Sequence, residues 1–340
     1  MQKLNLINAS HIAPQNIEWL WLGWIAQSKL HLLAGPPGTG KTNIALAIAA
    51  ILSAGAFWPC GTQAKQRKVV VWSGEDHPDD TLVPRLIAMG ANMENIAFVG
   101  DVQNRSSIRT FDPAADMNLL SEAMQDFGDV GLLILDPIVS CIDGDSHKNG
   151  EVRRALQPLV DLGIKSKCAI LGNTHLNKMS GRDPLDRVVG SVAFAALARV
   201  IFFAIKSKND PSRRILTRIK SNIGSDNSGY YYELPKIILQ ENIETTKIEW
   251  GDPYEGDVGS EIDGFNGDGK FDKSEIDDAC DFIKELLASG PIPATEIQEH
   301  AKKGGFAIST LRRAKARLNV KSIRANGFAG DGIWCWRLPK

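Results

Sequence analysis

Eight consecutive residues near the start of the chain have the spacing of a phosphate-binding loop. They are Gly35, Pro36, Pro37, Gly38, Thr39, Gly40, Lys41 and Thr42, and they match G-x-x-x-x-G-K-[ST] at every fixed position. Glycines let backbone N–H groups converge on phosphate oxygens, and the following helix N-terminus adds its positive dipole end. We expect Lys41 to bridge the β- and γ-phosphates of ATP and the Thr42 hydroxyl to ligate Mg²⁺. The alternative is a chance glycine turn.

An acidic residue ends an apolar run farther along the chain. Asp136 follows Gly131-Leu-Leu-Ile-Leu, which is the Walker B pattern. A carboxylate buried by such a strand is costly unless a cation compensates its charge. We therefore expect Asp136 to act with Thr42 on the metal side of the site. The alternative is an aspartate that caps the following turn.

Two more apolar runs end in polar residues that suit hydrolysis. Glu75 and Asp76 follow Val69–Gly74, and His175 follows Ala169–Thr174. An acid at the carboxyl end of a strand beside the P-loop strand points into the nucleotide crevice, so Glu75 is the expected general base. His175 would contact the γ-phosphate and report its presence to the following loop. The alternatives are a solvated loop for the acids and a structural role for the histidine.

These residues need a sheet that brings several strand ends to one edge. Over residues 30–206, apolar runs alternate with helical patterns. The expected strands are 29–34, 68–73, 96–99, 131–135, 168–173 and 200–205, and the expected helices are 41–54, 81–89, 114–127 and 151–165. This βαβα order predicts an α/β fold with a mostly parallel sheet and helices on both faces. Strands at 214–221 and 230–234 would add antiparallel pairing at one edge.

The composition is that of an ordinary globular protein. The chain has 340 residues, of which 43% are hydrophobic and 23% charged, and its formal net charge is −1. A nucleic-acid site must therefore come from local charge. The five cysteines lack C-x-x-C spacing, which disfavours zinc and fits a reducing cytoplasm. We see no signal peptide and no apolar run long enough to span a membrane, so we expect a cytoplasmic protein.

The composition changes after the expected sheet. Residues 241–272 contain ten acidic side chains and two lysines, which predicts a solvated linker. Within it, Gly264–Glu275 resembles a calcium-binding EF-hand loop, but glycine occupies the first ligand position and no helix precedes it. We interpret this stretch as linker.

The last segment has the pattern of a small DNA-binding domain. Helices are expected at 275–288, 294–303 and 309–318, with Ser309 as an N-cap, and two short strands flank residues 327–332. This order is typical of a winged helix-turn-helix. Residues 302–325 carry eight lysines and arginines and no acid, and the expected recognition helix contributes Arg312, Arg313, Lys315 and Arg317. The alternative is a basic helix in a protein-interaction domain.

As a set, these motifs resemble a RecA-like ATPase family that includes plasmid RepA replicative helicases and their phage and mobile-element relatives. The resemblance covers about residues 10–235. It rests on Trp19-Leu-Trp21, Leu32–Thr42, Ser73-Gly-Glu-Asp76, Pro84-Arg-Leu86, Leu135-Asp-Pro137 and Thr174-His175. It implies that Glu75 is the catalytic glutamate and that His175 is the γ-phosphate sensor.

The resemblance also implies a homo-oligomeric ring with ATP between subunits. The neighbour would donate basic residues to the transferred phosphoryl group. Arg199 and Lys220 match such positions. DnaB-type helicases have arginine two residues after the lysine, where this chain has Asn222, so Arg199 is the expected finger and Lys220 its helper. The alternative is that each is a surface base on a strand.

Two loops that face the pore in RecA-like rings are implied to contact single-stranded DNA. They are Ile142–Gly150 and Leu176–Arg187, and the second carries Lys178, Arg182 and Arg187. Neither loop contains an aromatic platform. The alternative is that both are surface loops without a ligand.

We therefore expect an ATP-hydrolysing, DNA-stimulated motor that uses Mg²⁺, as a replicative helicase or helicase-like protein of a mobile element. Its parts would be an N-terminal segment (1–28), a RecA-like ATPase domain (29–240), a linker (241–272) and a winged helix that contacts duplex DNA (273–340). Two alternatives remain: an ATP-switched DNA-binding regulator or loader without unwinding, and a recombinase-type filament in place of a six-membered ring.

Overall fold

The computed structural model divides the chain into two compact units, Met1–Gly264 and Phe265–Lys340, which are described separately. It describes residues 4–104, 107–144, 148–175, 192–207, 210, 212–224, 228–256, 261, 279–280, 282–284, 286–287, 290–303, 308–325 and 333–338. None of the helices in these ranges is both long and apolar enough to cross a bilayer.

A nine-stranded sheet forms the centre of the first unit, in the order β15-β12-β11-β10-β3-β9-β8-β4-β5. Six adjacent strands run in parallel: β10 (Val200–Lys206), β3 (Leu30–Gly35), β9 (Ala169–His175), β8 (Val130–Asp136), β4 (Lys68–Ser73) and β5 (Ile96–Phe98). β11 (Arg214–Ser221) and β12 (Gly229–Glu233) extend it in antiparallel fashion. The expected α/β fold with a mostly parallel sheet and an antiparallel edge is confirmed.

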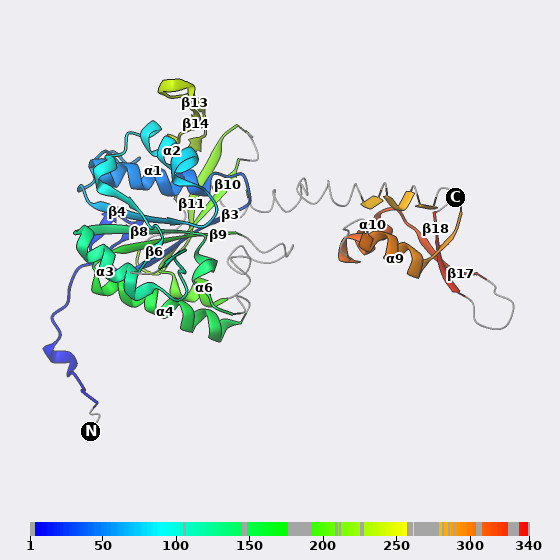
Figure 1. The fold of residues 1–340 in the computed structure, drawn as a ribbon, viewed down its shortest axis with the longest axis horizontal. Coiled ribbons are helices and arrows are strands. Elements are labelled where there is room, and N and C mark those ends of the chain that lie inside the picture. Colours follow the sequence, from blue (N-terminus) through cyan, green and yellow to red (C-terminus); the bar gives the residue numbers. More distant parts are fainter. Residues whose placement is uncertain are drawn as a thin grey trace. The chain divides into compact units, whose positions relative to one another are not determined.

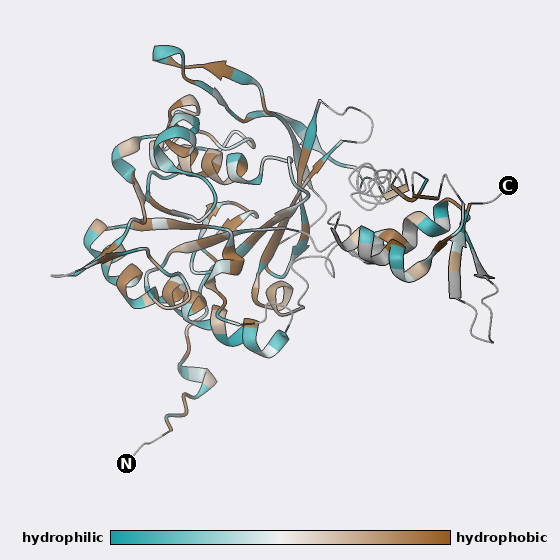
Figure 2. Ribbon diagram, turned by 45° about the vertical axis from the view of Figure 1, so that its right-hand side comes forward, coloured by the Kyte–Doolittle hydropathy of each residue, from teal (hydrophilic) through white to brown (hydrophobic). Residues whose placement is uncertain are grey.

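Helices cover both faces of this sheet (Figure 1). α1 (Lys41–Ala54) and α2 (Val83–Ala88) lie on one face, whereas α3 (Met117–Phe127), α4 (Asn149–Lys165) and α6 (Val192–Leu197) lie on the other. Apolar strands run through the interior between the two helical layers (Figure 2). α1 is buried on nearly all sides, which explains its apolar and alanine-rich sequence. Because the strands are parallel, their carboxyl ends gather at the edge where α1 begins.

An aromatic cluster ties the start of the chain to the sheet. β1 (Trp19–Trp21) and β2 (Ile25–Ala26) form a hairpin, and the Trp21 ring stacks on Trp24 and Trp58 with centroids 4.5 and 5.0 Å apart. Trp21 is 1% exposed and belongs to the core shared with α1. Large rings supply much buried area, so residues 19–26 belong to the core of the first unit, and the expected N-terminal segment (1–28) outside the domain is wrong for them.

A second correction concerns the expected linker. β13 (Lys236–Ile238) and β14 (Glu244–Thr246) form a hairpin, and β15 (Glu249–Tyr254) pairs with β12 at the sheet edge. Residues 244–254 are therefore folded, and the prediction of a linker starting at 241 is wrong for them. The many acidic residues of this segment made it resemble a linker, but three apolar residues fix it in place. Ile248 and Trp250 pack against the core, and Tyr254 is buried.

The second unit packs two helices against a small sheet. α9 (Ala294–Lys303) and α10 (Ile308–Arg317) accompany three antiparallel strands in the order β16 (Ile292–Pro293), β18 (Ile333–Arg337), β17 (Lys321–Ala325). Ile297, Leu311 and Trp336 contribute to its core. The described residues between 279 and 287 are helical. α10 begins at Ile308, so Ser309 lies inside the helix and is not its N-cap. The third strand, β16, was not predicted.

A buried histidine in β3 predicts how stability depends on pH. His31 is fully buried; its Nε2 accepts from the Ala26 N–H at 3.0 Å and its Nδ1 faces the Ile170 carbonyl at 3.1 Å. Burial lowers the pKa of His31 to about 4, although hydrogen bonds to backbone groups raise it. The folded pKa is thus below the unfolded value near 6.5, so this contribution to stability is complete above 6.5 and is lost as the pH falls toward 4.

We expect the free energy of unfolding in urea to fall by about 2 kcal/mol between about pH 6.5 and 5 through this group. His31→Gln should lower stability at both pH values and flatten this dependence. His11→Gln is the control, because His11 is exposed and the variant should keep the wild-type slope. An unchanged slope in His31→Gln would contradict the assignment.

Candidate active site

The phosphate-binding loop joins the carboxyl end of β3 to the start of α1. Gly38 and Gly40 have φ angles of +73° and +83°, in the left-handed region that glycine tolerates. A Cβ on Gly40 would lie 2.6 Å from Leu234 Cδ1, whereas a Cβ on Gly38 would have no neighbour within 4 Å. The loop is thus packed on its Gly40 side and open at Gly38. This geometry suits the binding of a phosphate chain by backbone N–H groups.

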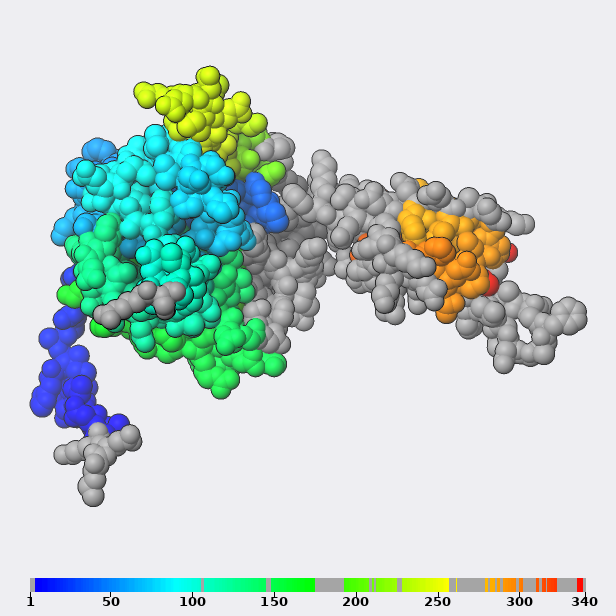
Figure 3. Space-filling model, viewed as in Figure 1, coloured from blue at the N-terminus to red at the C-terminus, as the bar shows by residue number. Residues whose placement is uncertain are grey.

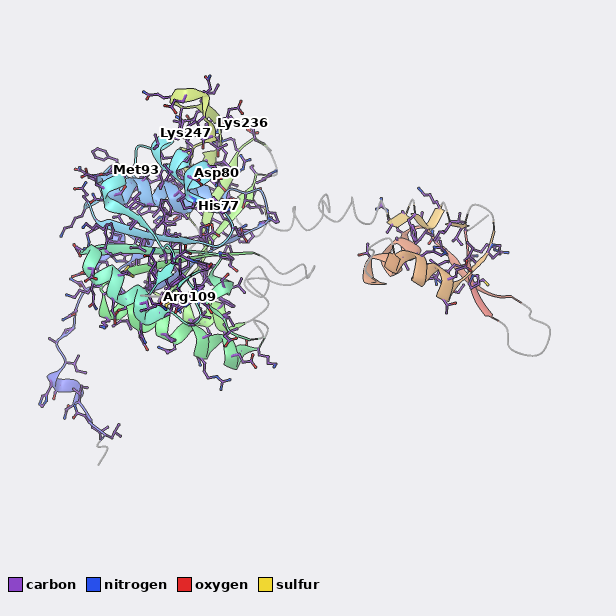
Figure 4. The ribbon with its side chains drawn as sticks, viewed as in Figure 1. His77, Asp80, Met93, Arg109, Lys236 and Lys247 are labelled. Atoms are coloured by element: carbon purple, nitrogen blue, oxygen red, sulfur yellow. The ribbon has the colours of Figure 1, made fainter. Side chains whose placement is uncertain are left out.

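Side chains of β12 and β14 form hydrogen bonds with the phosphate loop and with the start of α1. The Tyr232 hydroxyl of β12 donates to the Thr39 carbonyl at 2.6 Å, and Asn43 Nδ2 of α1 donates to Thr246 Oγ1 of β14 at 2.9 Å. The β13–β14 hairpin stands above the α2 region (Figure 3). A pocket of about 250 Å³ lies between the hairpin and α2, lined by Asp80, Thr81, Arg85, Lys236, Glu244, Thr245 and Thr246. Asp80 and Lys236 are labelled on the two sides of this region in Figure 4.

Lys41 lies folded into its own loop. Its ammonium donates to the carbonyls of Gly35 at 2.9 Å and Pro36 at 3.2 Å, and the residue is 8% exposed. Burial lowers the pKa of Lys41, while the charges of Asp136 and Glu75 raise it. The cation therefore lies close to both predicted acids. From this position the amine is available to a phosphate group held by the loop.

Thr42 and Asp136 meet at the metal side of the site. The Thr42 hydroxyl donates to Asp136 Oδ2 at 2.7 Å, and Asp136 is 6% exposed. Burial raises the pKa of Asp136; Thr42 and Asn173 lower it, and Glu75 and Asp76 raise it again. A divalent cation would compensate the charge of this buried carboxylate.

The donor set at this point fits Mg²⁺. Because Thr42 gives its only proton to Asp136, the lone pairs of its oxygen are left for a metal. No cluster of three or more His, Cys, Asp or Glu side chains forms a metal site among the described residues. Mg²⁺ commonly keeps several waters and is held by one or two protein groups together with substrate phosphates. Thr42, Asp136 and a bound nucleotide provide such a set.

The two neighbouring acids after β4 differ in their surroundings. Ser73 pairs with Asp136 in register, which brings Glu75 and Asp76 to the same edge. Asp76 forms an ion pair with Arg85 of α2 at 3.0 Å, and its N–H donates to Ser73 Oγ. Glu75 is exposed and lines a pocket of about 140 Å³ beside the strand end. Asp76 is thus held by α2, and Glu75 is the more exposed of the two acids.

The carboxyl end of β9 contributes two positions. The backbone of His175 pairs with Gly35 of the phosphate loop; its side chain lies outside the described part of the structure. Asn173 is fully buried two residues earlier. Asn173 and Tyr232 were not predicted as site residues, and Arg85 was named only as part of the motif Pro84-Arg-Leu86. An amide inside an otherwise apolar strand is the signal that could have identified Asn173.

Arg199 and Lys220 lie at the amino ends of the parallel strands, whereas the phosphate loop lies at the carboxyl ends. The Arg199 N–H donates to Leu30 at the start of β3, and Lys220 pairs with Ile201 at the start of β10. The length of β3, about 17 Å at 3.3 Å per residue, separates them from their own loop. Arg199 is exposed. Lys220 is folded onto the carbonyls of Ala195 and Ala198; burial and the charge of Arg199 lower its pKa.

The predicted DNA contacts are described only in part. Lys178, Arg182 and Arg187 lie outside the described residues, and of the loop 142–150 the ranges 142–144 and 148–150 are described. Arg312 and Arg313 belong to α10, but their side chains are not described. Arg317 is exposed. Lys315 donates to Ser322 Oγ at 2.6 Å and lies 4.4 Å from the centroid of the Trp336 ring, so it also braces α10 against the sheet.

Comparison with known proteins places the first unit in context. The AAA_25 family model, described as an AAA domain, matches residues 3–181. The crystal structure of the RadB recombinase resembles 66% of this chain and 93% of its own, with 17% identity and a TM-score of 0.45. No curated protein matches the chain.

Proposed function

Because the chain belongs to the AAA domain family whose model spans residues 3–181, we propose that it is an ATP-hydrolysing, DNA-stimulated motor that works as a ring of identical subunits. The hydrogen bond between Thr42 and Asp136 carries the nucleotide part of this proposal. It joins the phosphate loop to a buried acid in the arrangement that a magnesium–nucleotide requires. Within this proposal, the specific role of the motor is that of a replicative helicase or helicase-like protein of a plasmid, phage or other mobile element.

Each residue of the site has a chemical task in hydrolysis. Bound Mg²⁺ would supply charge neutralisation at the phosphates. Gly35–Thr42 bind the phosphate chain, and Lys41 stabilises negative charge between the β- and γ-phosphates. Glu75 orients water and accepts its proton at a carboxylate oxygen. Asp136 fixes the Thr42 hydroxyl, and His175 contacts the γ-phosphate.

The positions of two cations support the proposed ring. Arg199 is exposed at the amino edge of the parallel strands, a strand length from its own phosphate loop. A finger there would serve the site of a neighbouring subunit, where its charge would stabilise the transferred phosphoryl group. Lys220 would help by holding the end of α6 through its carbonyl contacts. We propose a closed ring, of six subunits in the family pattern.

DNA is the proposed partner of both units. Cations of the loop 176–187 would track single-stranded DNA in the ring's pore. In the second unit, the order of helices and strands supports a winged helix whose α10 contacts duplex DNA through Arg312, Arg313 and Arg317. Unwinding of a forked duplex tests the helicase role: robust turnover without strand separation would instead favour an ATP-switched regulator or loader.

Mixing two inactive variants tests the shared site. Lys41→Ala removes the loop cation and keeps Arg199, whereas Arg199→Ala does the reverse, and we expect each alone to be nearly inactive. In a random one-to-one mixture, about a quarter of the interfaces join an intact loop to an intact finger, so turnover should return to roughly that share. Mixing Lys41→Ala with a Lys41→Ala, Arg199→Ala double variant is the control and should stay inactive. No recovery in the first mixture, with ring formation verified by electron microscopy, would contradict a finger supplied by the neighbour.

A further inference from the structure

Asn173 is a buried amide near the carboxyl end of β9. It is fully buried, and neither Oδ1 nor Nδ2 has a partner among the described residues. Leaving a buried polar group unpaired costs about 1–3 kcal/mol. Leucine has the same number of side-chain heavy atoms and no such cost, so the folded chain alone gives no reason for an amide at this position.

The strand pattern shows where this amide lies. Side chains alternate between the two faces of a strand. Ala169 and Leu171 of β9, and Leu132 and Ile134 of β8, pack in the core cluster shared with α1. The same alternation brings Asn173 and Asp136 to that face. Leu135 pairs with Gly172 in register, so Asp136 and Asn173 are neighbours across the two strands at the edge where α1 begins.

The surroundings of Asp136 show what this amide can do. Thr42 occupies Asp136 Oδ2. The register between β8 and β9 places Asn173 next to Asp136 on the same face of the sheet. Residues behind a metal site that orient its ligands are typically worth 10- to 100-fold in metal affinity or activity. An amide next to this carboxylate across the two strands is suited to that task.

We propose that Asn173 is a positioning residue of the magnesium–nucleotide site, whose amide donates to Asp136 and holds the carboxylate toward the metal. This rests on the nucleotide binding proposed above and deepens it. Among the described residues the amide has no partner at ordinary hydrogen-bond distance, so the Asp136 carboxylate is the acceptor that its place in the sheet offers. Asn173 acts through Asp136 and does not touch the reacting atoms.

The test measures metal binding without hydrolysis. Mn²⁺, a paramagnetic substitute for Mg²⁺, is titrated against the full chain in the presence of ADP, and free Mn²⁺ is followed by electron paramagnetic resonance. Asn173→Leu is expected to weaken Mn²⁺ binding at least about tenfold. Its affinity for ADP in EDTA should stay the same. Its free energy of unfolding in urea shows whether the variant is folded under the conditions of the titration.

Two further variants sharpen the comparison. Asn173→Ala removes the amide without adding bulk and should reproduce the loss of Mn²⁺ affinity if the leucine variant does not fold. Ser166→Ala is the matched control: its Oγ is also buried and unpaired, but Ser166 lies after α4, near the amino end of β9. Ser166→Ala should leave Mn²⁺ binding unchanged.

Two results would overturn the proposal. One is an Mn²⁺ affinity in Asn173→Leu and Asn173→Ala within about twofold of the wild type. The other is a wild-type chain that binds ADP equally well with Mn²⁺ and with EDTA. A wild-type chain that binds Mn²⁺–ADP, loses that binding in Asn173→Leu and yet does not hydrolyse ATP would remove the proposed function and support this inference.

Discussion

Replacing Lys41 by alanine is expected to reduce ATP turnover by about 10²- to 10³-fold, the usual effect of removing a cation or donor aimed at transition-state charge. The Lys41 ammonium is buried beside Gly35 and Pro36 of the loop and close to Asp136 and Glu75. Alanine removes this charge from the site that holds the phosphates. Release of inorganic phosphate with and without single-stranded DNA measures the effect.

Lys68→Ala is the matched control for this experiment. Lys68 is also a partly buried lysine that donates to a backbone carbonyl, that of Phe127, but it lies at the amino end of β4, away from the loop. Its loss should lower the free energy of unfolding and leave turnover per folded chain close to the wild-type value. Wild-type turnover by a folded Lys41→Ala chain would falsify the assignment of the phosphate loop.

Glu75→Gln should separate nucleotide binding from hydrolysis. Glutamine keeps the size and polarity of the side chain but cannot accept a proton from water. General base catalysis is worth about 10²- to 10⁴-fold, so the single-turnover rate should fall by that factor while ATP affinity is retained. Chemical quench measures the rate, and a fluorescent ATP analogue measures the affinity.

The adjacent acid provides the control for Glu75. Asp76 is bound to Arg85 at 3.0 Å, so Asp76→Asn breaks a partly exposed ion pair worth up to about 1 kcal/mol and should change the rate only a few-fold. If Asp76→Asn instead loses hydrolysis and Glu75→Gln keeps it, the general base has been assigned to the wrong neighbour.

The parts of this fold that local patterns specify were predictable from the sequence. The helix after the phosphate loop has the predicted bounds, Lys41–Ala54, because a glycine turn starts it and Gly55, in a left-handed conformation, ends it. The parallel strands follow from buried apolar runs. β15 was missed because acidic residues dominate its neighbourhood, and only the tertiary contacts of Ile248, Trp250 and Tyr254 show why it pairs.

The candidate site was predictable to a similar extent. Motif spacing identified Lys41, Thr42 and Asp136, and the structure brings these three together. Arg199 lies at the amino ends of the parallel strands, away from its own phosphate loop, because of the direction in which β10 runs. A sequence motif does not contain that direction. Asn173 carries no motif at all: its place beside Asp136 depends on the register between β8 and β9. Registers and cross-strand neighbours are set by the packing of the whole sheet.

The flank of the phosphate loop comes from a distant part of the sequence. Tyr232 and Thr246 bond to Thr39 and Asn43, and Leu234 packs near Gly40, although all three lie beyond the matched residues 3–181. By thermodynamic reciprocity, a nucleotide that orders the loop must also protect β12 and β14 from opening, and loosening these strands must weaken the nucleotide. Amide hydrogen exchange in this distant segment therefore becomes a reporter of loop occupancy, and truncation after residue 181 would remove a wall of the site together with the strands β10, β11, β12 and β15.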